Sequence, residues 1–138
     1  MPVAAIAEAP HSPIGALIRR LANLTLAAAD QMELATARPD GSLRRPVTIW
    51  VVRYGGDLYV RSWRGRTSRW FRGSQDCHEG HIRAGGVDRD VGFVDVGDSV
   101  RHPIDAAYRT KYRRYGSRYV DPMVSPKARA ATIKLLPR

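Results

Sequence analysis

The chain has 138 residues and a mass of 15.4 kDa, which suits one domain of ordinary globular composition. Its 23 Lys and Arg residues outnumber its 13 Asp and Glu residues. The resulting net charge of +10 favours an anionic partner: a nucleic acid, a membrane surface or a phosphorylated cofactor. The single cysteine, Cys77, excludes an internal disulfide and with it a disulfide-stapled secreted scaffold.

No Lys or Arg precedes Arg19, so the N-terminus lacks the pattern of a signal peptide, and no apolar stretch reaches the ~20 residues of a membrane span. We therefore expect a cytoplasmic protein without a membrane partner. Residues 1–11 are small and rich in Ala and Pro, which predicts a loose N-terminal tail, and residues 12–138 are predicted to form a single domain.

The first predicted helix begins at Ser12 and Pro13, an N-cap residue followed by a first-turn proline, and it runs to about Ala28. Large apolar side chains recur along it at helical spacing, which predicts one apolar face. These residues are Ile14, Leu17, Ile18, Leu21 and Leu24.

Strand patterns follow the helix. Three antiparallel strands are predicted in a short-loop meander, as expected of a small sheet or barrel; they cover Met32–Ala37, Val47–Val52 and Leu58–Ser62. Two more, His81–Ala84 and Val91–Val96, flank the Gly85-Gly86 turn, and Thr132–Leu136 is predicted to close the sheet with Ile133 and Leu135 inward. The fold class is therefore α+β, with about six strands.

Helices are predicted in three later segments. The arginine-rich stretch 63–75 is expected to turn helical near Thr67 or Ser68, and Ser125-Pro126 repeats the cap-plus-proline signal of a short helix. Between these two segments, a helix is predicted to begin at Pro103. It places aromatic and apolar residues near one face: Ile104, Ala107, Tyr108, Tyr112 and Tyr115.

The segment 58–72 is the strongest candidate for a binding site, because it carries five arginines, three hydroxyls and no acid. A strand end would deliver Arg61 and Ser62 to a loop, where Gly65 lets backbone N–H groups approach a ligand and a helix begins near Ser68. Guanidinium forks, hydroxyls and oriented amides are the components of a phosphate site. A solvated basic loop is the alternative interpretation.

Two other segments carry reactive or charged side chains. Cys77-His78-Glu79-Gly80-His81 resembles a metal-ligand cluster, but it has no second ligand pair, so we expect a polar loop and no metal. The helix after Pro103 carries interleaved arginines and tyrosines that could lie on nucleic acid, although tyrosine spacing of this kind is typical of a core face.

An ordered series of residues resembles domain-of-unknown-function family 2255, a family of small prokaryotic proteins, from about Glu33 to Pro137. The series runs through Arg45–Val52, Leu58–Ser62, Gly65, Ser68, Trp70–Arg72, Ile82–Val87, Ile104–Arg109, Lys111-Tyr112 and Ala131–Leu135. The family in turn resembles the FMN-binding split barrels, which include pyridoxamine-phosphate oxidases and deazaflavin-dependent reductases. The resemblance implies a small antiparallel split β-barrel with flanking helices.

The resemblance also implies a cofactor site for FMN or a deazaflavin. The phosphate would be held by Arg61 and Ser62 with Arg66, Ser68 and Arg69, and the ring or ribityl chain would lie against Thr48 and Trp50. If the protein is an enzyme, it would be an oxidoreductase. The alternative is a non-enzymatic basic module that binds nucleic acid or another polyanion through residues 61–72 and 109–118; we expect only weak, nonspecific nucleic-acid binding.

A homodimer is expected from the strand at Val47–Val52, both faces of which are largely apolar. One face can line the barrel, and the other needs a cover, either the first helix through Ile14, Leu17 and Leu21 or a second subunit. The split-barrel relatives place the flavin at such an interface, which implies Trp50, Trp63 or Trp70 near the contact. A monomer covered by its own helices is the alternative.

Overall fold

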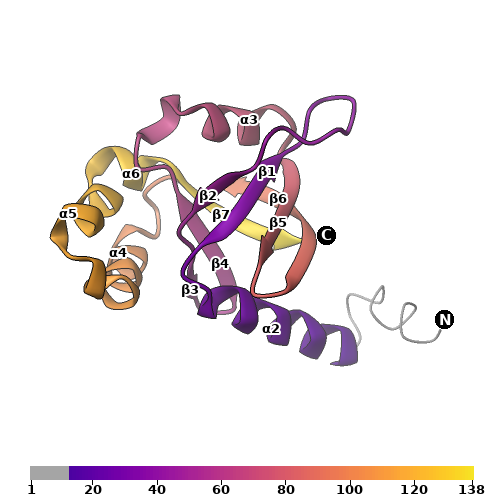
Figure 1. Cartoon of the computed structure of the whole chain (residues 1–138), viewed down its shortest axis with the longest axis horizontal. Helices are drawn as coiled ribbons and strands as arrows, with labels where there is room; N and C mark the ends of the chain where they lie inside the picture. Colours follow the sequence, from indigo (N-terminus) through magenta and orange to yellow (C-terminus); the bar gives the residue numbers. More distant parts are fainter. Residues whose placement is uncertain (1–12) are drawn as a thin grey trace.

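The structure is a computed structural model and describes residues 13–138 (Figure 1). The predicted tail at 1–11 and the cap at Ser12 lie outside the described residues. The helices are α2 (Pro13–Ala28), α3 (Arg69–Cys77), α4 (Arg101–Lys111), α5 (Ser117–Val120) and α6 (Pro126–Ala130), with short 3-10 turns η1 (Gly65–Thr67), η2 (Arg113–Tyr115) and η3 (Asp121–Val124). The strands are β1 (Met32–Thr36), β2 (Val47–Ile49), β3 (Val52–Tyr54), β4 (Asp57–Arg61), β5 (Glu79–Ala84), β6 (Val87–Asp95) and β7 (Thr132–Pro137).

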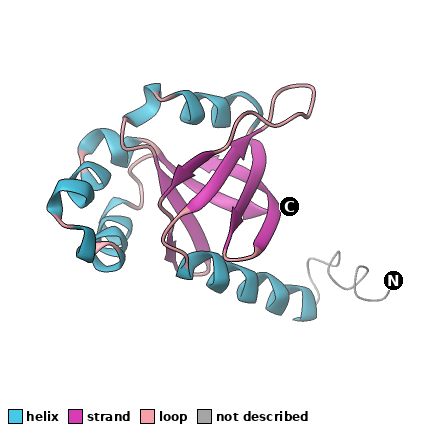
Figure 2. Ribbon diagram, viewed as in Figure 1, coloured by secondary structure: helices cyan, strands magenta, loops and turns pink. Residues whose placement is uncertain are grey.

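The described strands form one antiparallel sheet in the order β2-β1-β5-β6-β7-β4-β3, and the sheet curls into a split barrel (Figure 2). The two edge strands, β2 and β3, are consecutive in the chain and are joined only by Trp50 and Val51. The opening of the barrel is therefore crossed by a single extended segment, which pairs with β1 on one side and with β4 on the other. This confirms the α+β split barrel, with seven strands in place of about six.

The single strand predicted at Val47–Val52 is wrong, because the chain leaves the sheet at Trp50 and Val51. The Val51 N–H donates to the Tyr112 hydroxyl (3.0 Å), and the Val51 carbonyl accepts from the Lys111 ammonium (2.6 Å). Side chains of a distant helix thus satisfy the backbone groups that a neighbouring strand would otherwise take. The predicted three-stranded meander is divided for the same reason between the two ends of the sheet.

Two buried clusters hold the fold together. The larger fills the barrel and includes Leu34, Val51, Val60, Phe71 and Ile82. The second lies between the outer face of β3–β4 and the helices after β6, and it contains Val52, Tyr59, Ile104, Tyr108, Tyr112, Val120, Met123 and Val124. Adjacent residues Val51 and Val52 enter different clusters, so α4 and η3 supply the cover that the apolar strand required.

The first helix does not supply that cover through the predicted residues. Its Ile14 and Leu17 are 52% exposed and its Leu21 is 54% exposed, whereas Gly15 and Leu26 are buried. The Ser68 cap of α3, the Ser125 cap of α6 and the inward Ile133 and Leu135 of β7 are confirmed. The helix predicted to open at Pro103 begins at Arg101 and ends at Lys111, so Tyr115 lies in η2 and is 40% exposed. The strand predicted at Val91–Val96 begins already at Val87.

Candidate functional site

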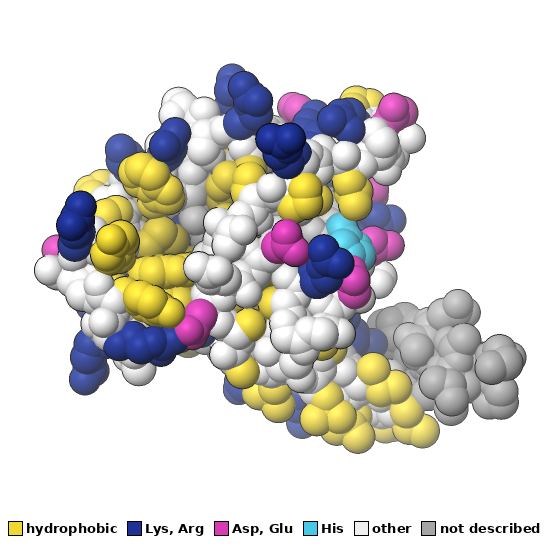
Figure 3. All heavy atoms as spheres, in the orientation of Figure 1, with side chains coloured by type: hydrophobic (Ala, Val, Ile, Leu, Met, Phe, Trp, Pro, Cys, Tyr) yellow, Lys and Arg dark blue, Asp and Glu magenta, His cyan; other side chains and the backbone are white. Residues whose placement is uncertain are grey.

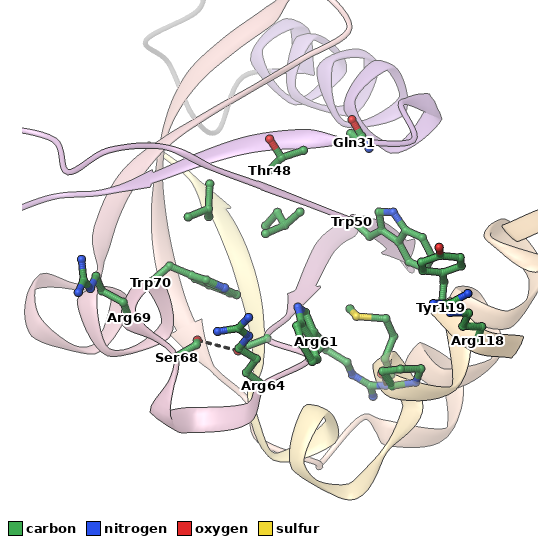
Figure 4. Close-up of a pocket in the computed structure, with 16 residues that line it drawn as sticks. Gln31, Thr48, Trp50, Arg61, Arg64, Ser68, Arg69, Trp70, Arg118 and Tyr119 are labelled. Carbon is green, nitrogen blue, oxygen red and sulfur yellow. Dashed lines mark hydrogen bonds between the residues drawn. The ribbon is translucent and has the colours of Figure 1, made fainter. Parts of the chain in front are cut away.

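A pocket of about 690 Å³ opens at the split of the barrel (Figure 4). Its walls come from the edge segment at β2, the end of β4, the start of α3 and the turn of α5 and η3. The lining residues are Gln31, Val47, Thr48, Ile49, Trp50, Arg61, Ser62, Trp63, Arg64, Ser68, Arg69, Trp70, Arg118, Tyr119, Pro122 and Met123. Four arginines and no carboxylate line it, so its charge is positive.

One end of the pocket has the components of a phosphate site. Arg64 and Arg69 are exposed, and neither makes an ion pair within residues 13–138. Ser68 caps α3 and accepts from the Phe71 N–H (3.4 Å), so the first N–H groups of a nine-residue helix point toward this end. The hydroxyls of Ser62 and Ser68 lie 2.7 Å apart. The structure therefore brings together Ser62, Ser68 and Arg69 of the predicted set.

Arg61 reaches the pocket wall, but its guanidinium is buried elsewhere. It donates to Asp105 Oδ1 (2.5 Å), to Thr132 Oγ1 (2.9 Å) and to the Met123 carbonyl (3.0 Å). Arg129 donates to the other oxygen of the same carboxylate (2.8 Å). Because its donors already have partners in the protein, Arg61 supports the site from behind its wall and has little capacity left for a ligand.

Arg66 lies outside the pocket lining. Its guanidinium pairs with Asp95 (2.7 Å) and donates to the Ala130 carbonyl (2.8 Å). The Arg66 hydrogen bond holds the pKa of Asp95 below its usual value. This arginine therefore ties η1 to the end of β6. Arg64 lines the pocket but was not among the predicted site residues. The sequence could not distinguish Arg66 from Arg64, because both are arginines of the same loop.

The opposite wall is aromatic, and the predicted Thr48 and Trp50 both lie on it (Figure 4). The indole of Trp50 stacks on the ring of Tyr112, with centroids 3.9 Å apart and planes 1° from parallel. The Tyr112 hydroxyl in turn donates to the Asp30 carbonyl (2.7 Å). This stack fixes the Trp50 ring, so the edge segment presents a rigid aromatic surface to the pocket.

Sequence reasoning missed the wall formed by α5 and η3. Arg118 and Tyr119 stand across the pocket from Ser68 and Arg69 in Figure 4, and the Arg118 guanidinium lies 5.7 Å from the Tyr119 ring centroid. Arg118 makes no ion pair within residues 13–138. The only sequence signal was the basic, tyrosine-rich composition of residues 109–118, which predicted a packed helix face equally well.

The histidine-rich segment lies away from the pocket. His81 contacts Asp88 and Asp90 on the β5–β6 hairpin, with Nδ1 2.9 Å from Asp90. No cluster of three or more potential metal ligands occurs within residues 13–138. Over the same residues, no helix has both the length and the apolar character needed to cross a bilayer.

Solved structures with low sequence identity share this fold. A conserved hypothetical protein of Mycobacterium tuberculosis, Rv2991, matches with a TM-score of 0.59 and 13% identity over 86% of this chain and 78% of its own. HutZ, a heme storage protein of Vibrio cholerae, matches with a TM-score of 0.58 and 14% identity over 84% of this chain and 88% of its own.

Campylobacter jejuni ChuZ matches with a TM-score of 0.62 and 14% identity over 94% of this chain; the chain spans just 56% of the length of ChuZ. No curated protein matches the sequence. A family model matches residues 23–135, which include every pocket residue named above. The chain therefore belongs to DUF2255, the family described as uncharacterized protein conserved in bacteria.

Proposed function

We propose that the pocket binds a phosphorylated flavin-type cofactor, FMN or a deazaflavin. The observation that carries this proposal is a cavity with an aromatic wall and three arginines, Arg64, Arg69 and Arg118, that have no acidic partner among the described residues. Such a cavity matches a ligand that is flat, aromatic and anionic. The volume of about 690 Å³ lies within the range of cofactor pockets.

The proposed placement follows the asymmetry of the pocket. Arg64 and Arg69, with Ser68 and the start of α3, would hold the phosphate, because charge, hydroxyl and helix N-terminus meet there. Thr48 and Trp50 would lie against the ring system. When bound, a flavin supplies hydride transfer, which would make the protein an oxidoreductase; the chain itself binds, orients and shields the ring. Arg61 supports the wall from behind, and the Ser62 hydroxyl lies 2.7 Å from that of Ser68 at the phosphate end.

Fluorescence titration with FMN and with a deazaflavin tests this proposal. Arg64→Ala and Arg69→Ala should each weaken binding by about 1.5–3 kcal/mol, roughly 10- to 150-fold, the value of a hydrogen bond to a charged group. Arg66→Ala is the matched control, because Arg66 belongs to the same loop but pairs with Asp95 outside the pocket. Absence of saturable binding of either cofactor to the wild type would refute the flavin assignment.

Haem is a second candidate, favoured by the shared fold with the heme storage protein HutZ. An aromatic pocket with arginines could also hold the propionates of a porphyrin. Iron usually takes a His, Cys, Met or Tyr ligand, and of these the lining offers Tyr119 and Met123 alone. A haemin titration that yields a sharp, saturable Soret shift, without displacement of haem by FMN, would favour this candidate.

The nucleic-acid alternative depends on the arginines of residues 61–72 and 109–118 acting as one basic surface. Arg61 is buried, Arg66 pairs with Asp95, and Arg114 pairs with Asp30. These pairs remove three cations from the predicted surface, so we expect weak, nonspecific binding of nucleic acid. Together with the flavin-type cofactor, we propose that the protein is a cytoplasmic homodimer.

A further inference from the structure

The pocket carries more positive charge than one phosphate balances. Asp105 neutralises Arg61 behind the wall, which leaves Arg64, Arg69 and Arg118 without an acidic partner within residues 13–138. A phosphate monoester has a charge of about −1.5 to −2 at neutral pH, so a cofactor phosphate balances about two of these three guanidinium groups. One positive charge in the cavity therefore remains for a second anionic group.

Arg118 is the arginine that stands apart from the phosphate end. In Figure 4 it lies with Tyr119 on the wall that faces Ser68 and Arg69. The two walls belong to different elements, since Arg118 is part of α5 and Ser68 caps α3. Arg64 and Arg69 lie on either side of Ser68 in the chain, so they are placed to share the first anion. The second anion falls to Arg118.

The wall that carries Arg118 has a fixed backbone, although α5 has only four residues. The Met123 carbonyl of η3 accepts from the buried Arg61 guanidinium (3.0 Å). At the start of α5 the Gly116 carbonyl accepts from the Val120 N–H (3.1 Å), and the Val120 side chain is buried in the second core cluster. These contacts hold the segment on both sides of Arg118, which therefore faces the pocket from a rigid wall.

The surroundings of Arg118 define the chemical class of the second anion. Its guanidinium lies 5.7 Å from the ring centroid of Tyr119, whose side chain is 56% exposed, and Pro122 and Met123 line the same part of the pocket. On the face shown in Figure 3, hydrophobic side chains gather between α5 and the barrel, with Lys and Arg side chains along the outer rim. A guanidinium binds a carboxylate through two parallel hydrogen bonds, and an aromatic ring with apolar neighbours favours a flat apolar body. These features match a planar organic acid.

We propose that Arg118 and Tyr119 form a second subsite, which binds the carboxylate of a planar organic acid in the same cavity as the flavin. This assignment rests on the proposed function, because the first anion is the cofactor phosphate at Arg64 and Arg69. It adds a substrate class to that function: as an oxidoreductase, the protein would act on flat carboxylic acids held by Arg118.

Calorimetric titration of the FMN-saturated protein with naphthalene-2-carboxylate, a flat acid without phosphate, tests the subsite. Wild type should bind one acid per chain, and it should bind the neutral naphthalene-2-carboxamide at least about 10-fold more weakly. Arg118→Gln should raise the dissociation constant of the acid about 10- to 150-fold and leave the affinities of the amide and of FMN unchanged. Arg113→Gln is the matched control, because Arg113 is also exposed but lies outside the pocket lining.

Equal affinities for the acid and the amide would overturn the proposal, as would an acid affinity that Arg118→Gln does not change. A loss of FMN affinity in Arg118→Gln as large as that in Arg64→Ala would make Arg118 a cofactor ligand and would also overturn it. The same titration without FMN separates the two proposals. If FMN does not bind, acid binding that depends on Arg118 keeps the subsite and removes the flavin alone, whereas no saturable acid binding in either form refutes the subsite.

Discussion

The guanidinium of Arg61 lies among acceptors from three different elements, with its side chain fully buried beside Asp105. Burial of such a pair costs desolvation energy. The attraction between the two charges offsets this cost only while both partners and their hydrogen bonds are present. Arg61 therefore fixes the positions of β4, α4 and β7 behind the pocket.

Arg61→Ala should lower the free energy of unfolding by about 3–5 kcal/mol, because it leaves the buried Asp105 with Arg129 alone. Urea denaturation measures the effect. Arg66→Ala, which breaks an exposed pair, should cost less than about 1 kcal/mol. If Arg61→Ala kept its stability and lost just cofactor affinity, Arg61 would be a direct ligand of the phosphate.

Tyr112 acts at the break in the edge strand. Tyr112→Phe should lower the free energy of unfolding by about 1–3 kcal/mol, because the buried Val51 N–H loses its acceptor. Thermal unfolding measures this. Tyr115→Phe serves as the comparison, since its exposed hydroxyl bonds to the Asp30 side chain at the surface and should change the stability little. Equal losses in both variants would contradict a special role for the Val51 contact.

At the scale of elements, the sequence predicted the helices and most strands because their signals are local: capping serines, helical spacing and β-branched runs. The break at Trp50 and Val51 depends on Tyr112 and Lys111, about 60 residues away in the chain, and no local pattern encodes such a contact. For the same reason, the two apolar faces of the segment Val47–Val52 predicted that both sides of the sheet are covered. They did not predict that α4 covers one side.

The candidate site shows the same division. Composition located the arginine-rich segment after β4, of which Arg64, Ser68 and Arg69 line the pocket, and the resemblance added Thr48 and Trp50, which line it too. Which arginines face the pocket depends on acidic partners brought in by distant elements, Asp105 for Arg61 and Asp95 for Arg66. Arg118 was missed because α5 reaches the opening only through tertiary packing.

The β5–β6 hairpin should make stability depend on pH. Hydrogen bonds to Asp90 and then to Asp88 raise the pKa of His81 above its usual value. The protonated ring is thus favoured in the folded state, so its contribution is complete below about pH 6.5 and disappears as the pH rises through the higher folded-state pKa. His81→Gln should flatten this loss of stability between pH 6 and 8 relative to wild type. Parallel slopes for the two proteins would show that the pair contributes nothing.

For the whole molecule, the net charge of +10 predicts attraction to polyanions, and exposed arginines without an ion pair lie outside the pocket as well as in it, but the proposed site holds a single phosphate. A plot of log binding constant against log salt concentration should therefore have a slope near −1 or shallower for one phosphorylated cofactor. For a protein that neutralises several DNA phosphates, the slope becomes more negative by about 0.9 for each phosphate. Titrations with FMN and with duplex DNA between 50 and 200 mM salt compare the two. Nanomolar binding to one DNA sequence at physiological salt would favour the polyanion alternative.

The break between β2 and β3 also bears on aggregation. Each edge of the sheet is a strand of three residues, and the chain turns out of the sheet directly after β2 and directly before β3. An edge this short offers few unpaired backbone groups as a template for another chain, which is how natural sheets avoid edge-to-edge polymerisation. A continuous strand over residues 47–54 would have been a longer template, so the break at Trp50 and Val51 also limits growth of the sheet into fibrils.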